Sequence, residues 1–284
     1  YTNATTTGLV NAKTKAWDTQ IIHALGLTED LFKPLFLPSS VVSDLSTDVQ
    51  KAVGFNSTVL FAPSHDTASA VCACPMQDDD LYISSGTWSL IGTEITEPIL
   101  NDNARKLNFT NEGGIDYRFR FLKNYMGMWL FQNIRRNLNK SMSYDEMMSL
   151  AKNCGEHKYF DVNDSTLVAP KNMIDAIGRL IRSDDLGLIL NSAYHSLAKS
   201  YSEAVTEIET VTGKRFNAIH IVGGGCQDKY LNALTRDYTG KSVTAGPIEA
   251  TATGNIVSQI MHDKKISLAT AREIVKNSFD IKEI

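Results

Sequence analysis

The sequence predicts an α/β protein, and three features of its second half carry that prediction. Short apolar runs of strand length, such as Ala218–Val222, alternate with segments of helical periodicity. A run of three glycines follows that apolar run and precedes the next helical segment, as in a strand–turn–helix unit. Apolar residues recur at helical spacing from Leu186 to Ile208. Because strands that alternate with helices pair in parallel, we expect a partly parallel sheet covered by helices.

Composition and charge describe an ordinary globular chain and argue against several classes of partner. The 284 residues are 43% hydrophobic and 21% charged, which allows one large domain or two modest ones. The net charge is -4 and no run is rich in Lys or Arg, so no nucleic-acid partner is expected. No apolar run reaches the roughly 18 residues of a membrane helix, so no membrane partner is expected. Four cysteines without zinc-site spacing favour a reduced, cytoplasmic protein.

The first part of the chain predicts a helix, a buried strand and a second helix. Apolar residues at helical spacing cover 17–25, and Gly26 is placed to end that helix. The apolar run Val59–Ala62 is long enough for a buried strand, which Pro63 ends. Small residues fill 67–74, which suits a helix packed closely on that strand.

The middle of the chain predicts a hairpin, a further strand and a helix. Two strands are expected within 81–93, joined by a tight turn at 84–87. The acidic triplet Asp78–Asp80 before them is expected to be a solvated turn. A third strand is expected in 117–122 and a helix in 126–138.

The final part of the chain predicts the alternating pattern. The long helix is expected to end at Gly213. After the strand at 218–222 and the glycine run, we expect a helix over 227–238, a strand over 242–245 and helices to the end. No repeat of about 20–50 residues indicates a solenoid or propeller.

The segment Ser64-His65-Asp66-Thr67 is the first candidate for chemistry. It lies between a predicted strand and a predicted helix, and ligands gather at the carboxyl ends of strands in open α/β sheets. Asp66 can accept a proton from a substrate hydroxyl that attacks phosphorus, and His65 can hydrogen-bond the same substrate. The alternative is that Ser64 or Asp66 only caps the helix. A serine-hydrolase triad does not fit, because triads assemble from separate segments.

Two glycine-containing turns are candidates for phosphate binding. In Ser84–Ser89, backbone N–H groups of a hairpin turn and the Thr87 hydroxyl can surround an anion. An ordinary β-hairpin is the alternative, because glycine is common in its turn. Gly223-Gly224-Gly225 precedes a helix N-terminus, which favours anions, although a tight structural turn explains it equally. Asp228 rules out the dinucleotide fingerprint, and the strand after Gly240-Lys241-Ser242 rules out a P-loop.

Other polar residues carry little information by themselves. Asn124 and Gln132 lie around the predicted helix that contains Trp129, and exposed Asn and Gln are common. The histidines without metal-like spacing, which we expect to be structural or solvated, are His23, His157, His195 and His220.

Seven segments together resemble the FGGY carbohydrate kinases. They follow the family's order over almost the whole chain, and the ordered set is far more specific than any one of them. The segments are Thr2–Thr7, Ala62–Val71, Ile83–Ser89, Thr110–Gly114, Leu122–Leu130, His220–Gln227 and Ala245–Ala250. The pieces Asn111–Gly114 and Lys123–Gly127 favour the branch that acts on L-rhamnulose over those for xylulose or glycerol.

This resemblance implies a fold and a reaction. The fold is the actin-like ATPase (ribonuclease H-like) fold, with two α/β domains. Residues 1–76 would then be the tail of the first, sugar-binding domain, and residues 77–284 a nearly complete nucleotide-binding domain. The implied reaction is transfer of the ATP γ-phosphate to the 1-hydroxyl of L-rhamnulose, with Mg²⁺.

For the sugar, the resemblance implies four contact residues. Asp66 matches the general base, and His65, Thr67 and Asn124 match further positions of the sugar site. We expect the Asp66 carboxylate to be held where a sugar oxygen and the terminal phosphate of ATP come together.

For ATP, the resemblance implies three contact residues. Thr87 matches a phosphate contact, Gln132 a nucleotide contact and Gly224 the phosphate region. Gly223 and Gly225 would shape the turn around Gly224.

The family's phosphate-binding hairpin, whose Asp and Gly lie near the metal, is not found in this sequence. Asp185-Leu186-Gly187 has similar letters but leads into the long helix. We therefore expect that the N-terminal domain is missing and acts as a partner, that no metal ligand lies in this chain, and that the chain alone has little kinase activity.

Three other interpretations remain open. The closest is another FGGY sugar or polyol kinase, such as a fuculokinase or a xylulokinase. The second is a non-catalytic nucleotide-binding module, since fold does not fix function, and an intact Asp66 argues against it. The third is a plain α/β domain with structural glycine turns, which would not bind ATP.

Overall fold

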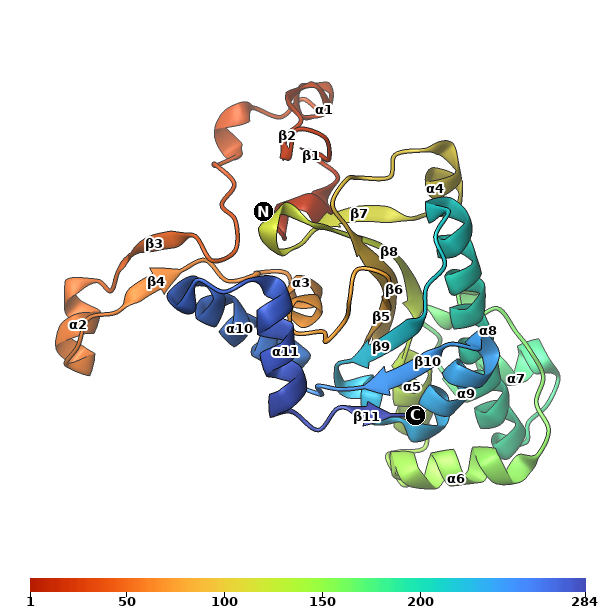
Figure 1. The fold of residues 1–284 in the computed structure, drawn as a ribbon. Helices are drawn as coiled ribbons and strands as arrows, with labels where there is room; N and C mark the ends of the chain where they lie inside the picture. The colour runs from red at the N-terminus through yellow and green to blue at the C-terminus, as the bar shows by residue number, and fades with distance from the viewer. The chain divides into compact units, whose positions relative to one another are not determined.

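The computed structural model describes residues 1–284 (Figure 1). The chain divides into two compact units. Each unit is assembled from stretches that are far apart in the sequence. The first unit comprises Tyr1–Asp78, Thr93–Leu122 and Glu249–Asp280, and the second unit comprises Asp79–Gly92, Lys123–Ile248 and Ile281–Ile284. The two units are described one at a time.

A mixed sheet of seven strands is the main β structure of the chain. Its strands are β5 (Leu81–Ser85), β6 (Trp88–Ile95), β7 (Thr110–Gly113), β8 (Phe119–Met126), β9 (Ala218–Val222), β10 (Ser242–Ala245) and β11 (Lys282–Glu283). Their order is β11-β10-β9-β5-β6-β8-β7. β9 pairs in parallel with β5 and β10, whereas the β5–β6, β7–β8 and β10–β11 pairs are antiparallel. The α/β class and the parallel pairing predicted for the second half are confirmed.

The helices of the second unit gather around the long helix α8 (Leu186–Thr212). Asp185 caps its start by accepting a hydrogen bond from Leu188 N, and Gly213 ends it with a φ of 67°. The other elements are α5 (Trp129–Asn137), α6 (Tyr144–Cys154), η4 (Ser165–Leu167), α7 (Met173–Ile181), η5 (Gly224–Gln227) and α9 (Lys229–Thr239). α6, α7 and α9 pack on α8. The long helix was predicted; α6 and α7 were not. No helix in the chain has both the length and the apolar character to cross a bilayer.

The first unit contains short elements before residue 73 and two longer helices at its end. The short elements are η1 (Ala4–Thr7), β1 (Val10–Asn11), β2 (Ala16–Trp17), α1 (Thr19–Ala24), η2 (Glu29–Leu31), β3 (Val41–Asp44), α2 (Thr47–Val53), β4 (Thr58–Leu60) and α3 (Asp66–Cys72). The others are α4 (Asp102–Lys106), η3 (Ile115–Tyr117), α10 (Ala250–Lys264) and α11 (Leu268–Ser278). α10 lies against α3 and also contacts α11 (Figure 1).

The strand and helix predicted before residue 75 exist, but their packing differs from the prediction. β4 is only partly buried, because it pairs with β3 alone in a sheet of two strands. α3 has α10 as its main packing partner, and not β4. Apolar residues of α10 and α11 meet the end of α3 in a buried cluster made of Cys72, Ala73, Ile115, Val257, Met261, Leu268, Ala271 and Val275.

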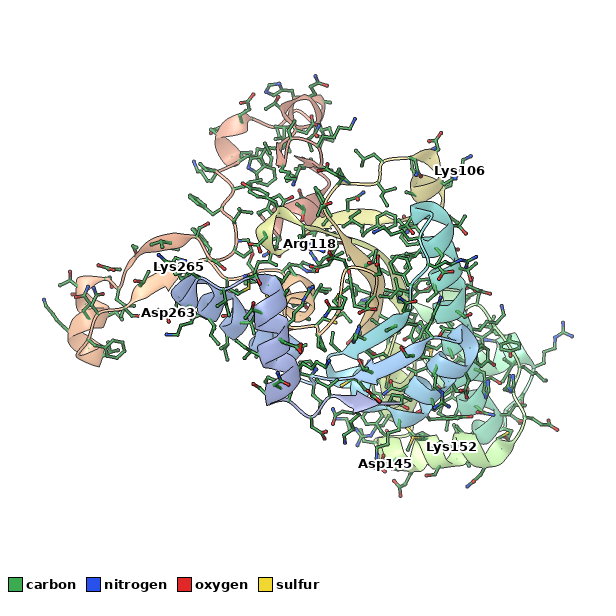
Figure 2. The ribbon with its side chains drawn as sticks, viewed as in Figure 1. Lys106, Arg118, Asp145, Lys152, Asp263 and Lys265 are labelled. Atoms are coloured by element: carbon green, nitrogen blue, oxygen red, sulfur yellow. The ribbon has the colours of Figure 1, made fainter.

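A buried ion cluster reinforces this part of the first unit. Glu94 Oε2 lies 2.6 Å from an Arg272 NH2 group and 3.4 Å from Nε of Arg118, which Figure 2 labels. Arg272 also donates to the backbone oxygen of Val71 in α3 at 2.9 Å, and Arg118 pairs with Asp78 at 2.5 Å. Breaking a buried pair leaves an uncompensated charge, so loss of Glu94 or Arg272, the two most buried members, would destabilise the unit.

The acidic triplet before β5 is not the fully solvated turn that the sequence suggested. Asp80 is only 8% exposed, and its Oδ2 lies 3.0 Å from Nε2 of His220 on β9. The Nδ1 atom of the same ring lies 2.8 Å from the Thr244 hydroxyl on β10. The triplet therefore ends in a residue that ties β5 to β9, and His220 is structural, as expected.

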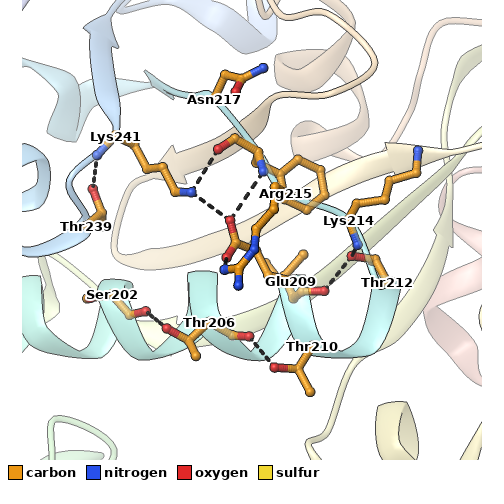
Figure 3. A network of polar contacts seen from close by, with 12 residues as sticks. Ser202, Thr206, Glu209, Thr210, Thr212, Lys214, Arg215, Asn217, Thr239 and Lys241 are labelled. Atoms are coloured by element: carbon orange, nitrogen blue, oxygen red, sulfur yellow. Dashed lines mark hydrogen bonds and ion pairs between the residues drawn. The ribbon is translucent and has the colours of Figure 1, made fainter.

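A second polar network joins α8 to the strands that follow it (Figure 3). The buried carboxylate of Glu209 accepts a hydrogen bond from Lys241 at 2.6 Å and also pairs with Arg215. Lys241 further donates to the backbone oxygen of Phe216 at 2.8 Å. Burial raises the pKa of Glu209, but the hydrogen bonds from Lys241, the Phe216 N–H and Arg215 outweigh it and hold the pKa below its usual value.

Candidate active site

A pocket of about 470 Å³ in the second unit contains most of the residues that were expected to bind ATP. Gln132 and Gly224 line it, and Gly86, the neighbour of Thr87, lines it as well. The full lining is Gly86, Met128, Gln132, Ser143, Tyr144, Asp145, Met148, Gly224, Gly225, Gln227 and Asp228. Its volume lies within the range of small-molecule sites.

The three glycines after β9 differ in their backbone conformation and in the space around them. Gly223 adopts a φ of 86°, a left-handed value that other residues rarely take. A Cβ on Gly225 would lie 2.0 Å from the Ser85 hydroxyl oxygen, so only glycine fits there. A Cβ on Gly224 would meet nothing within 4 Å, because this residue faces open space. The loop is therefore packed on the end of β5 at its flanks and open in its middle.

The hairpin turn between β5 and β6 is held by the chain that leaves β8. Trp129 N donates to the Thr87 backbone oxygen at 3.1 Å, and Gly127 N donates to the same oxygen at 3.2 Å. A Cβ on Gly127 would lie 2.7 Å from the Trp88 carbonyl carbon, which explains the glycine in this segment. As a result α5 brings Gln132 next to the turn, and the Thr87 hydroxyl donates to Gln132 Oε1 at 3.4 Å.

The turn offers fewer free backbone donors than the sequence suggested. The Gly86 N–H donates to the Trp88 carbonyl oxygen at 2.9 Å, so this donor is already used. The Thr87 side chain is exposed, and the glycine loop lies beside the turn through Ser85. The exposed Thr87 side chain and the open Gly224 backbone are therefore the accessible parts of the two turns.

Two acidic residues, Asp145 and Asp228, also line the pocket and were not predicted. Asp145 and Tyr144 come from the first turn of α6, where Figure 2 labels Asp145. Asp228 accepts hydrogen bonds from the Tyr194 hydroxyl at 2.8 Å and from Leu231 N at 3.0 Å, and burial raises its pKa. No Lys or Arg lines the pocket. The capping box at the start of α6 was a local signal that could have located this helix.

The Asp66 segment lies in the first unit, at the start of α3. Asp66 is the first residue of the helix, its side chain is 79% exposed, and its Oδ1 accepts the Thr67 N–H at 2.6 Å. His65 occupies the N-cap position without a side-chain capping bond. Neither Ser64 nor Asp66 is the N-cap residue, so the capping alternative does not describe this helix.

Helix α10 positions the start of α3. The Thr251 hydroxyl donates to the Asp66 backbone oxygen at 3.2 Å, and the Ser69 hydroxyl donates to the Thr251 backbone oxygen at 2.8 Å. A Cβ on Gly254 would lie 1.7 Å from the Ser69 backbone oxygen, so the two helices touch through a glycine. Sequence reasoning missed this support, although a glycine within a helical pattern often marks a close approach.

Two buried charged residues behind His65 were also missed. Arg120 is fully buried, and its NH1 lies 3.4 Å from His65 Nδ1 while its NH2 pairs with Glu112 Oε2 at 3.1 Å. Arg120 stands between two apolar residues of β8, and such a charged residue in an apolar strand is a usable signal.

The predicted residues thus gather in two groups. Thr87, Gln132 and Gly224 lie together in the second unit, and His65, Asp66 and Thr67 lie together in the first unit. Asn124 lies on β8 with an exposed side chain and does not line the pocket of its own unit, so its sugar contact stays a prediction. No group of three or more His, Cys, Asp or Glu that could hold a metal ion is present.

Comparison with known families gives two matches along the chain. Residues 1–73 match the N-terminal domain of the FGGY family of carbohydrate kinases, and residues 81–262 match its C-terminal domain. The expectation that the N-terminal domain is missing is therefore wrong, because a match to that domain occupies the start of the chain.

Several curated relatives cover nearly the whole chain. The rhamnulokinase of Halalkalibacterium halodurans is 46% identical over 99% of this chain and 62% of its own length. The rhamnulokinases of Oceanobacillus iheyensis and Bacillus subtilis are 42% and 39% identical, over 99% of this chain and 61% and 60% of their own lengths. The chain therefore spans about 60% of the length of these relatives.

Solved structures of sugar and polyol kinases share the fold. Glycerol kinase of Plasmodium falciparum with ADP superposes with a TM-score of 0.72 and 15% identity, covering 96% of this chain and 56% of that one. Ligand-bound xylulose kinase of Lactobacillus acidophilus gives a TM-score of 0.71 and 14% identity, covering 98% and 57%. The predicted actin-like ATPase fold is confirmed. The C-terminal domain of the FGGY family matches more than half of the residues, so the chain belongs to the FGGY family of carbohydrate kinases.

Proposed function

We propose that the protein phosphorylates L-rhamnulose with ATP, and that this chain supplies the nucleotide pocket and the general base. The observation that carries the proposal is the gathering of Gly224, Gln132 and the Thr87 turn around one pocket. The resemblance that assigned those residues to ATP made no use of their positions in space. The names of the 39–46% identical relatives support L-rhamnulose as the sugar.

The lining of the pocket suits both the phosphates and the nucleoside of ATP. The glycine loop lets the backbone approach phosphate oxygens, and the Thr87 hydroxyl adds a donor. The Asp145 carboxylate at the start of α6 would repel phosphate and suits the ribose and base. Because no basic side chain lines the pocket, the triphosphate would enter with its own counter-ion. Mg²⁺ fits this need, since it binds through phosphates and few protein groups, and it would neutralise the phosphate charge.

Asp66 suits the role of general base. Its carboxylate is exposed, one oxygen is fixed by the Thr67 N–H, and helix α10 holds the backbone behind it. A carboxylate held in this way can accept the proton of the sugar 1-hydroxyl as that oxygen attacks phosphorus. Phosphoryl transfer needs positioning and charge neutralisation more than covalent help, so no protein group has to form a bond with the sugar or the phosphate.

A kinetic assay on the protein at its natural length tests the proposal. ADP release is measured with ATP, Mg²⁺ and L-rhamnulose, with L-fuculose and D-xylulose in parallel. We expect the highest kcat/KM for L-rhamnulose, whereas preference for another sugar would assign the protein to another branch. ATP binding without sugar-dependent ADP release would instead support a non-catalytic module.

Asp66→Asn separates chemistry from binding. It keeps the shape of the side chain but removes the base, so we expect kcat to fall roughly 10²–10⁴-fold with nearly unchanged ATP affinity. Unchanged kcat would remove Asp66 from its role. The expectation that the chain 1–284 alone has little activity stays a prediction, and the same assay on that chain decides it.

A further inference from the structure

A buried guanidinium lies directly behind the His65 ring in the first unit. Arg120 of β8 is fully buried, and its NH1 lies 3.4 Å from Nδ1 of His65. We propose that Arg120 is a positioning residue for phosphoryl transfer, which holds His65 in the tautomer with its proton on Nε2 so that the ring offers an N–H donor to the sugar. This rests on the proposed function, in which His65 contacts the sugar.

The direction of the Arg120 side chain is fixed by β7. Its Nε donates to the Gly113 backbone oxygen at 3.2 Å, and its NH2 pairs with Glu112 Oε2 at 3.1 Å. Glu112 stands opposite Arg120 in the antiparallel register of β7 and β8. A guanidinium is planar and rigid, so two fixed nitrogens also set the direction of the third. The third nitrogen, NH1, faces His65.

The tautomer follows from the chemistry of the two groups. A guanidinium carries only donors, whereas a neutral imidazole has one N–H donor and one acceptor nitrogen. An Arg120 N–H directed at Nδ1 therefore needs the lone pair at that atom, and the ring proton of His65 is left on Nε2. The other tautomer would set two donors against each other and leave a buried Arg120 donor unsatisfied.

Three charged groups face the ring: Arg120, Glu112 and Asp66. Burial first, and then Arg120, lower the pKa of His65, while the two carboxylates oppose them. Asp66 Oδ1 lies 3.5 Å from Nδ1, but that oxygen already accepts the Thr67 N–H and the carboxylate is largely exposed. Its attraction for a ring proton is therefore weakened by solvent. The ring is neutral at neutral pH, with its only N–H on the edge away from Arg120.

Two substitutions of His65 distinguish the roles of its two ring nitrogens. In His65→Asn the amide oxygen can take the place of Nδ1 and keep Arg120 satisfied, but no group reaches the Nε2 position. In His65→Gln the amide reaches the Nε2 position as a donor, but Arg120 loses its partner. We expect His65→Asn to melt close to wild type with kcat/KM for L-rhamnulose lowered roughly 10–100-fold, the loss of one hydrogen bond near the reacting atoms. His65→Gln should melt lower and keep more of kcat/KM. The reverse order of the two variants in kcat/KM would overturn the proposal.

Nitrogen-15 NMR of the His65 ring gives a readout that does not depend on activity. In the wild-type protein we expect Nε2 to carry the proton and Nδ1 to show the shift of an acceptor. Arg120→Met should raise the pKa of His65, because the Arg120 charge then no longer adds to burial in opposing Glu112 and Asp66, and Arg120→Lys should lower that pKa again in part. If Arg120→Met does not fold, the wild-type spectrum and the comparison of His65→Asn with His65→Gln still test the positioning role.

The two proposals fail in different ways. A wild-type ring with its proton on Nδ1, or a ring charged at neutral pH, refutes the positioning role even in a protein that phosphorylates L-rhamnulose rapidly. The expected tautomer in a protein that phosphorylates no sugar refutes the proposed function, and with it the catalytic purpose assigned to Arg120.

Discussion

The contact between α3 and α10 gives a sharp prediction, because it depends on one missing side chain. A Cβ placed on Gly254 would lie 1.7 Å from the Ser69 backbone oxygen and 2.5 Å from its carbonyl carbon. Real Cβ atoms essentially never approach closer than 3.0 Å, so in Gly254→Ala the two helices must separate by at least about 1.3 Å. The atoms in the way are backbone atoms, which cannot rotate aside as a side chain can.

Two effects of Gly254→Ala oppose each other, and their sizes decide the sign. Alanine favours a helix over glycine by about 1 kcal/mol. Overpacking of a tight contact costs about 1–3 kcal/mol and occasionally more, and a clash of this depth with backbone belongs at the upper end. We therefore expect a net loss of about 2 kcal/mol in the free energy of unfolding, which corresponds to roughly 4–8 °C in Tm for a chain of this size.

Thermal and denaturant unfolding of Gly254→Ala measure this loss. Ile256→Ala on the same helix is the matched control, because Ile256 is 58% exposed and little change is expected there. Since α3 carries Asp66, kcat should fall in Gly254→Ala as well. A variant as stable as wild type, or more stable, would refute the close-contact reasoning.

Three further predictions follow from the other networks. In Gly225→Ala, a Cβ 2.0 Å from the Ser85 hydroxyl oxygen should disturb the glycine loop and weaken ATP binding roughly tenfold by calorimetry, and adding Ser85→Gly should restore part of it; no recovery would contradict the packing argument. Glu209→Gln should lower the free energy of unfolding by about 1–3 kcal/mol at pH 7. Because the folded pKa of Glu209 lies below its usual value of 4.5, its stabilisation is present above that pH and is lost as the pH falls through the folded pKa. The difference from wild type should therefore shrink in acid, and a constant difference would count against it. Arg272→Met leaves Glu94 with fewer buried partners and should destabilise the protein by about 3–5 kcal/mol in urea unfolding, whereas an unchanged midpoint would mean that Arg118 alone is sufficient.

The sequence by itself determined the features that depend on neighbours along the chain. The long helix, the parallel strand after it, the hairpin at 84–87 and the glycine loop at 223–225 were all predicted, because periodicity and turn chemistry act over a few residues. The ordered motifs identified the family and predicted the residues that bind ATP. The same reasoning wrongly expected the N-terminal domain to be missing, because it relied on one phosphate-binding hairpin that was not found, whereas a match to that domain covers residues 1–73.

Only the tertiary structure decided which distant residues meet. Gly254 touches Ser69, Asp80 meets His220, and Arg120 lies behind His65, in each case across a long separation in sequence. From its neighbours in the sequence alone, Gly254 is an ordinary glycine in a helix, Asp80 is a solvated acid, and Arg120 is a charged residue between apolar ones. Their roles come from burial, which makes a close contact or an unpaired charge costly only where the fold excludes water. No local pattern in the sequence specifies that exclusion.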